Sequence, residues 1–281
     1  MKDKKFIKMY LLTGAIIGAL LGYTAFDKKT FQITKTTLTS DKIISGIKVA
    51  ILADLHGQTY GKDNKRLIRA IDEQKPDIVL FAGDMLTYNT IIGSKAYNTF
   101  LALCKTLASK YPVYYVFGNH EIDIGYKFKE DIVNTGVKLV NRDTYQVDIN
   151  GNPLTIMGIY HMDSSGEKII RKKKAYLTRQ LIDDSRYKIL LYHYPEKAVK
   201  YLSDLNTDVI ISGHAHGGQW RLFGRGVYSP GEGWFPRHTA GVHRIGRPIL
   251  VISRGIGSHV LVPRINNPAE LLILSLEPNR S

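Results

Sequence analysis

The side chains of this sequence that could do chemistry follow apolar runs rich in β-branched residues. Each run is typical of a buried strand. A lone aspartate at a strand end would more often cap a helix. Histidine seldom caps, however, and a buried carboxylate without partners is costly. We therefore interpret the set as one binding site. Its members are Asp54, His56, Asp84, Asn119, His120, His193, His214 and His216.

The donor set indicates two divalent metal ions. It contains carboxylates, one side-chain amide and several imidazoles but no thiolate, which suits Mn, Fe, Zn or similar ions. The donors are too many for one tetrahedral ion, but they fit two ions that share a bridging carboxylate. Two such ions, about 3.5–4 Å apart, activate a water and clamp a phosphoryl group for in-line attack by a bridging hydroxide. Two aspartates and the hydroxide leave a charge of about +1, which would attract a phosphate ester.

An α/β architecture is needed to position these donors. Strands are expected at 47–54, 77–84, 113–120, 154–161, 187–194, 208–216, 248–253 and 270–276, and helices at 62–75, 94–110, 126–135, 167–184 and 195–203. Runs of apolar residues separated by helices indicate sheets covered by helices. Ligands of open α/β sheets bind beyond the carboxyl ends of the strands, so donors far apart in sequence can converge there. Residues 217–247 show no clear periodicity and are interpreted as a loop.

The segment "ISGHAHGGQW" places two imidazoles one residue apart after an apolar run. Alternate residues of such a turn can point to the same side, so His214 and His216 can reach two neighbouring ions. Gly213, Gly217 and Gly218 permit the tight backbone that this turn requires.

Five segments occur in the order "DLH", "GD", "GNHE", "YHYP" and "GHAHGG", and together they resemble the calcineurin-like metallophosphoesterase family. The resemblance covers about residues 47–276. It implies a four-layer β-sandwich flanked by helices. It also implies that Asp54, His56 and His216 hold the first ion, that Asn119, His193 and His214 hold the second, and that Asp84 bridges the two.

The residues around Asn119 have different expected roles. His120 matches the family's non-ligand histidine, which contacts the phosphate and protonates the leaving group. Glu121 and Asp123 are expected to be loop residues, or at most to orient metal-bound imidazoles. Four histidines outside the motifs are not expected to bind the metals directly: His161, His238, His243 and His259.

The region 221–264 is rich in arginine. It contains Arg221, Arg225, Arg237, Arg244, Arg247, Arg254 and Arg264, with no lysine and one acid, Glu232. Arginine without lysine favours planar, bidentate recognition of phosphate. With the interleaved aromatic residues, the region could hold a nucleotide, a sugar phosphate polymer or a lipid headgroup. The alternative is a packed loop with solvated arginines. We name Arg254 and Arg264, with His120, as candidates for substrate binding.

The C-terminal "SRGIGSHVLVPRINNPAELLILSL" and the "GGQ" after His216 resemble a bacterial subgroup of membrane-linked phosphodiesterases. Relatives of that subgroup include UDP-2,3-diacylglucosamine pyrophosphatases. The resemblance implies a phosphodiester or pyrophosphate substrate, either a phosphorylated small molecule or a lipid-linked one. A twin-arginine signal is missing before the apolar stretch, which departs from the exported members.

Residues 1–28 are expected to form a single-pass membrane anchor, 29–46 a tether and 47–281 the catalytic domain. Within 29–46, "FQITKTTLTS" is interpreted as a short alternating strand or a tether. "MYLLTGAIIGALLGYTAF" is uncharged and near the minimum length for a transmembrane helix. A secretory signal peptide is the alternative, but Tyr23 fits its cleavage site poorly. Lysines flank the segment on both sides, so the positive-inside rule does not decide the orientation of the segment in the membrane. We expect the catalytic domain on the extracytoplasmic side.

Charge and cysteine content narrow the function classes. The net charge of +14 favours anionic partners, with solubility as the alternative reading. Cys104 is the single cysteine, so no disulfide framework or cysteine zinc site is available. No P-loop or nucleophile elbow is present.

These observations predict a monomeric hydrolase at the cell membrane that uses two divalent metal ions. Mn is the first expectation, and Fe and Zn are the alternatives. A nuclease is a second candidate, although a membrane anchor does not suit one and nucleic acid is not expected as a partner. A catalytically silent binding module of the same fold is the third candidate. The intact ligand set favours the enzyme.

Overall fold

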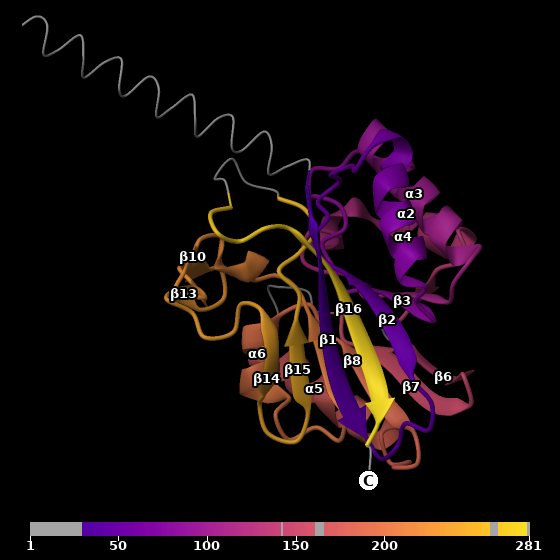
Figure 1. Ribbon diagram of the computed structural model, residues 1–281, viewed down its shortest axis with the longest axis vertical. Helices are drawn as coiled ribbons and strands as arrows, with labels where there is room; N and C mark the ends of the chain where they lie inside the picture. The colour runs from indigo at the N-terminus through magenta and orange to yellow at the C-terminus, as the bar shows by residue number, and fades with distance from the viewer. Residues whose placement is uncertain (1–29, 142, 161–165, 259–263, 280–281) are drawn as a thin grey trace, which may run out of the picture.

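The protein is described by a computed structural model that covers residues 30–141, 143–160, 166–258 and 264–279. Two six-stranded sheets form its centre (Figure 1). The first has the order β1-β16-β2-β3-β4-β5, and β16 runs antiparallel to β2. Its strands are β1 (Gln32–Ser40), β16 (Glu270–Pro278), β2 (Ile47–Leu52), β3 (Ile78–Phe81), β4 (Val113–Tyr115) and β5 (Lys138–Leu139).

The second sheet has the order β14-β15-β9-β8-β7-β6. Its four inner strands are parallel, and the edge strands β14 and β6 run antiparallel to their neighbours. The strands are β14 (Gly241–Arg244), β15 (Ile249–Ile252), β9 (Val209–Ser212), β8 (Tyr187–Leu191), β7 (Asn152–Gly158) and β6 (Thr144–Ile149).

Alternation along the buried strands produces four layers. In β2, Val49 and Ile51 face the second sheet, whereas Ala50 and Leu52 face helices. The helices on the first sheet are α2 (Lys65–Gln74), α3 (Lys95–Ala108) and α4 (Tyr126–Asn134). The second sheet is covered by α5 (Gly166–Gln180) and α6 (Pro195–Tyr201). Successive side chains of one strand therefore pack into two different cores, one between the sheets and one beneath the helices. The α/β class with helix-covered sheets is confirmed, and Cys104 is buried in α3 as expected.

The segment expected to be a tether, 29–46, instead contains an edge strand of the first sheet. β1 pairs in parallel with β16 along its whole length, from Gln32 beside Glu270 to Ser40 beside Pro278. Of the two interpretations of "FQITKTTLTS", the alternating strand is therefore the one observed, and its polar alternation fits an edge strand, which needs only one buried face. Leu38 supplies part of that face and lies in the core between the sheets.

The region 217–247 also has more structure than expected. It forms two small hairpins, β10 (Arg221–Leu222) with β11 (Arg225–Gly226) and β12 (Tyr228–Ser229) with β13 (Gly233–Trp234), before β14 joins the second sheet. Strands of two residues are too short to show a period of two in the sequence, which is why the pattern did not reveal them.

The predicted anchor, residues 1–28, lies outside the described residues. Among the residues that the structure does describe, no helix has both the length and the apolar character needed to cross a bilayer.

We predict that Leu38→Ala lowers the free energy of unfolding by about 2–3 kcal/mol, because it opens a cavity in the core between the sheets. Ile33→Ala in the same strand is the matched control. Ile33 is exposed, so its truncation should change stability little. Urea unfolding of the full chain measures both. Equal, small effects would mean that β1 does not pack on the domain.

Candidate metal centre

The carboxyl ends of parallel strands from both sheets meet at one edge of the molecule. Asp54 and His56 follow β2, Asp84 follows β3, and Asn119 and His120 follow β4. From the second sheet, His193 follows β8, and His214 and His216 follow β9. The backbone ties these loops together, because Asp54 N donates to Gly83 O and Gly213 N donates to His193 O. The strand-end pattern of the sequence is therefore one site in space.

Several of these residues have left-handed backbone conformations. The φ angles of Asp54, His56, Asp84, His214 and His216 lie between 47° and 67°. Aspartate and histidine are among the few non-glycine residues enriched there, and such conformations cluster at functional sites. Local strain is therefore concentrated where the donors converge.

Two glycines leave the space that the carboxylates occupy. A Cβ atom on Gly118 would collide with Oδ1 of Asp84. A Cβ atom on Gly213 would lie 2.6 Å from Oδ2 of Asp54. Neither position tolerates a side chain without displacing a carboxylate.

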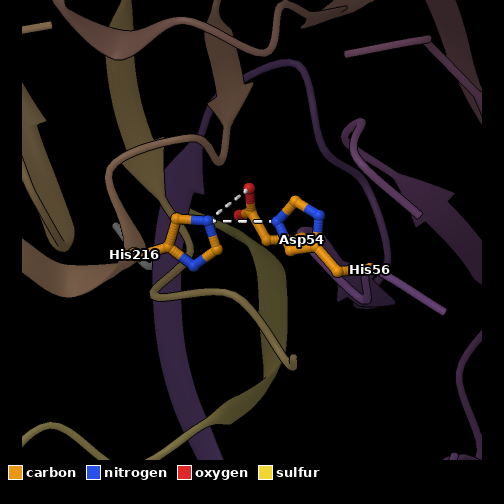
Figure 2. A group of neighbouring side chains, drawn as sticks. All are labelled: Asp54, His56 and His216. Atoms are coloured by element: carbon orange, nitrogen blue, oxygen red, sulfur yellow. Dashed lines mark hydrogen bonds and ion pairs between the residues drawn. The ribbon is translucent and has the colours of Figure 1, made fainter. Parts of the chain in front are cut away.

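Asp54, His56 and His216 form the first group of donors (Figure 2). The Nε2 atoms of the two imidazoles lie 3.1 Å apart, and Nε2 of His216 lies 3.6 Å from Oδ1 of Asp54. Two nitrogens bound to one ion at about 2.0–2.1 Å would have a similar separation. His214 N donates to both oxygens of Asp54, at 3.0 and 3.1 Å, which fixes the carboxylate. The three side chains could hold one divalent ion.

Asp84, His193 and His214 form the second group. Nδ1 of His193 lies 2.7 Å from Ala82 O, so the ring donates there and turns Nε2 toward the site. This is the usual way in which a metal-binding histidine is oriented. Nε2 then lies 3.1 Å from Oδ2 of Asp84 and 3.9 Å from Oδ1 of Asp54. A third group, His56, Asp84 and His120, joins the other two through shared members.

The protonation of these groups reflects their burial and mutual proximity. Burial raises the pKa of Asp54 to about 7, although His193 opposes the shift. Burial would lower the pKa of His193, but the Asp84 carboxylate raises it to about 10. Burial also acts on Asp84, yet His193 beside it lowers the pKa of that carboxyl. A divalent ion would replace the proton on His193, so metal binding must release protons.

Asn119 tests whether the site fits a metal. Its Oδ1 atom is buried, and no described residue donates a hydrogen bond to it. A buried amide oxygen without a donor is costly unless a cation satisfies it. The nitrogen and oxygen chemistry of the whole set suits borderline ions such as Mn, Fe and Zn. The donors therefore fit two divalent ions, with no preference among metals shown.

His120 lies at the mouth of the site, where its ring packs edge-on against His56 with centroids 4.7 Å apart. Its Nδ1 accepts a hydrogen bond from Tyr88 N at 3.2 Å. In the neutral ring the proton therefore resides on Nε2, 3.7 Å from Oδ2 of Asp84. The sequence did not reveal Tyr88, because a backbone donor leaves no mark on residue type. This arrangement suits a proton donor.

Glu121 supports the site much more closely than expected. It is buried, and its carboxylate accepts hydrogen bonds from the backbone N–H groups of Asp84, Leu86 and Gly118, at 2.7–3.0 Å. Burial and the nearby Asp84 charge raise the pKa of Glu121 to about 7. One side chain thus joins the loops after β3 and β4. Asp123, by contrast, is exposed.

Asn267 and Arg264 hold the histidine turn from behind. Nδ2 of Asn267 donates to His216 O at 2.7 Å and to Gln219 O at 3.0 Å. The guanidinium of Arg264 lies 3.2 Å from Nδ1 of His216 and donates to Gly257 O at 2.7 Å. Asn267 lies in the C-terminal segment that resembles the bacterial subgroup, but nothing in the sequence indicates a role for this residue at the site.

Neither arginine proposed for substrate binding presents an open guanidinium. Arg264 is 1% exposed, so its geometry favours holding His216 in place. Arg254 pairs with Glu270 at 2.7 Å and donates to Thr34 at 3.0 Å, which links three strands. Direct contact of either residue with substrate stays a prediction.

The histidines outside the motifs are occupied elsewhere or not described. Nδ1 of His238 lies 2.6 Å from Oε1 of Glu232. His243 bonds to Ala240 O at 3.0 Å. His161 and His259 lie outside the described residues.

Two helix-covered sheets with three linked groups of candidate metal donors at their shared edge are typical of a metal-dependent hydrolase. Sequence comparison makes this more specific. The model of the calcineurin-like phosphoesterase family matches residues 47–218. The chain belongs to that family, so the resemblance in its motifs is confirmed. The assignment of individual donors to one ion or the other remains a prediction.

Curated relatives match most of the chain. The uncharacterized metallophosphoesterase YkuE of Bacillus subtilis is 26% identical, covering 99% of this chain and 98% of the relative. The phosphodiesterase YaeI of Escherichia coli is 26% identical over 82% of each chain. Among solved structures, TT1561 of Thermus thermophilus has a TM-score of 0.52 at 12% identity, covering 76% of this chain and 90% of that one. The last likeness shows the fold alone.

We predict that Glu121→Gln weakens Mn²⁺ binding by about 10–100-fold, because residues behind the ligands contribute that much to affinity. The amide would place an N–H group against backbone N–H donors. Asp123→Asn, a nearby exposed carboxylate, is the control and should bind like the unmodified chain. Isothermal titration with the purified full chain measures both. Equal affinities in the two variants would contradict a positioning role for Glu121.

Proposed function

We propose that this chain is a metal-dependent hydrolase of phosphodiesters or pyrophosphates, acting at a membrane on a lipid-linked or other phosphorylated small molecule. The observation that carries this proposal is the convergence of three donor groups. Within each group, the ligand atoms lie within 4.8 Å of one another. Shared members link the groups, which is how one carboxylate could serve two ions.

The protein's own part in the reaction is to bind, orient and protonate. Two divalent ions, when bound, supply a nucleophile from water and offset the negative charge of the phosphoryl group. Asp54, His56 and His216 would hold one ion, while His193, His214 and Asn119 would hold the other beside Asp84. Manganese is our first expectation, with iron and zinc as alternatives accepted by the same donors.

His120 is suited to deliver a proton to the leaving oxygen. Its Nε2 lies near the Asp84 carboxylate, and its Nδ1 is fixed by the backbone N–H of Tyr88. An alkoxide or a phosphate anion leaves slowly unless it is protonated or otherwise stabilised as its bond to phosphorus breaks. His120 is only slightly exposed, so it would meet a substrate that has entered the site.

The proposed substrate class, a phosphodiester or pyrophosphate, is supported by other observations than those that support the metal site. One relative is named as a phosphodiesterase. The C-terminal "SRGIG" and "VPRINNP" segments resemble membrane-linked phosphodiesterases and UDP-2,3-diacylglucosamine pyrophosphatases. The apolar run before residue 28 and the net charge of +14 suit an anionic substrate at a lipid surface. An extracytoplasmic domain is part of the same proposal.

We predict that the full chain with Mn²⁺ hydrolyses bis-p-nitrophenyl phosphate and prefers a UDP-diacyl sugar. Asp84→Asn should lower both rates by at least about 10³-fold, since it removes the carboxylate shared by two of the three donor groups. Asp63→Asn, an exposed aspartate in the left-handed region that asparagine also accepts, is the matched control. Product release is followed by absorbance and by chromatography. Activity retained by metal-loaded Asp84→Asn would contradict the dimetal assignment.

We predict that His120→Asn lowers kcat by about 10²–10⁴-fold, the usual worth of a general acid, while the metal content stays near that of the unmodified chain. His243→Asn, outside the donor groups, should change neither. Metal content is read by inductively coupled plasma mass spectrometry beside the rate. Loss of the metals from His120→Asn would make His120 a ligand instead.

A further inference from the structure

The two hairpins that follow the metal-binding turn expose large apolar side chains. We call these side chains the hairpin patch; they are Trp220, Leu222, Phe223, Tyr228, Trp234 and Phe235. Phe223 is 106% exposed at the tip of the first hairpin, and Trp234 and Phe235 are 72% and 74% exposed on the second. Scattered exposed apolar residues are normal, but a cluster of this size on short hairpins marks a contact surface.

The patch is fixed relative to the metal-binding turn. Val227 N donates to Gly218 O at 3.2 Å and to Trp220 O at 2.8 Å. The guanidinium of Arg221 donates to Gly217 O at 2.9 Å. These bonds join both hairpins to the residues directly after His216. Figure 1 shows β10 and β13 standing out from the body of the domain on the left. The patch therefore holds a fixed position next to the metal-binding turn.

Charge beside the patch favours an anionic partner. Arg225 is exposed on the first hairpin, and Arg237 is exposed three residues after the second. The single acid of the region, Glu232, is occupied by Nδ1 of His238 at 2.6 Å. Aromatic rings with neighbouring cations are typical of surfaces that sit in the headgroup region of anionic lipids.

The chain also enters the domain at this edge. Gln32, the first residue of β1, pairs with Glu270. Glu270 N donates to Gly255 O, and Ile256 N donates to Ala53 O, next to the ligand Asp54. The described chain begins at residue 30, so the predicted anchor precedes the strand end nearest the metals. Both an anchor there and the hairpin patch would bring the same edge to a bilayer.

We propose that the hairpin patch inserts into the headgroup region of an anionic bilayer and holds the metal site against the lipid surface. The inference rests on the proposed action at a membrane. A phosphodiester or pyrophosphate of a lipid could then reach the site while its acyl chains stay in the bilayer. A bilayer is favoured over a protein partner because exposed aromatic side chains beside the exposed guanidinium groups of Arg225 and Arg237 suit the boundary between the acyl chains and the anionic headgroups.

Tryptophan fluorescence tests this contact separately from the anchor. The chain has two tryptophans, Trp220 and Trp234, and both belong to the patch. The full chain, with Trp220→Phe, is reconstituted into vesicles of phosphatidylcholine with or without phosphatidylglycerol. Lipids brominated near the headgroup, at the depth of about 5–10 Å that interfacial side chains reach, should quench Trp234 by about twofold. Quenching should weaken when phosphatidylglycerol is left out.

Phe223→Ser with Phe235→Ser should remove most of the quenching. The double variant should also hydrolyse a UDP-diacyl sugar in vesicles about tenfold more slowly, because roughly 1.4 kcal/mol of surface binding corresponds to that factor. Its rate on bis-p-nitrophenyl phosphate should be unchanged. Ile182→Ser is the control, since Ile182 is 77% exposed in a different region of the chain.

The outcomes separate this inference from the proposed function. Unquenched Trp234 in an active chain would overturn the bilayer contact and leave the hydrolase intact. Unquenched Trp234 with a dimer that the double variant abolishes would assign the patch to a second copy. Strong quenching in a chain that hydrolyses neither substrate would support the contact and reject the proposed function.

Discussion

Two carboxylates, Asp54 and Asp84, lie almost wholly inside the protein at the edge shared by its two sheets. Transferring such charges from water costs several kcal/mol each after relaxation, and they also repel one another. Much of the surrounding structure compensates for that cost. The N–H of His214 donates to Asp54, and the N–H of His120 donates to Asp84. The side chain of His193 lies between both. Two divalent cations, when bound, would complete the compensation and supply a nucleophile from water.

The two-sheet fold answers the question of how so many donors can reach one place. Parallel strands end at the same edge, and the packing of one sheet on the other brings both sets of ends together. The turns are then shaped individually, by left-handed residues and by glycines at Gly118 and Gly213 where a side chain would strike a carboxylate. Glu121 and Asn267 connect turns that are far apart in the sequence. The site is rigid because its supports come from several strands.

The sequence predicted the inner strands, the helices and all the donors that converge. Those elements have strong signals, since buried strands are continuous apolar runs and metal donors stand out by type. Elements with one-sided or very short patterns were harder to predict. For β1 the sequence did not decide between a strand and a tether, because its partner β16 lies nearly the whole chain away. The hairpins after His216 were too short for any period.

The supporting residues were harder to predict than the ligands. Glu121 and Asp123 look alike in sequence, yet one is buried under three backbone donors and the other is exposed. Arg254 and Arg264 were chosen for a substrate, and both guanidinium groups are bound to the protein itself. Residue type records the capacity to bind, whereas the direction in which a side chain points depends on tertiary packing.

We propose that these donors hold two ions side by side. Anomalous diffraction from crystals of the Mn²⁺-loaded chain, recorded on both sides of the manganese absorption edge, would locate them. We expect two peaks about 3.5–4 Å apart, one beside Asp54, His56 and His216 and the other beside His193 and His214, with Asp84 between them. A single peak, or two peaks that do not share Asp84, would contradict it.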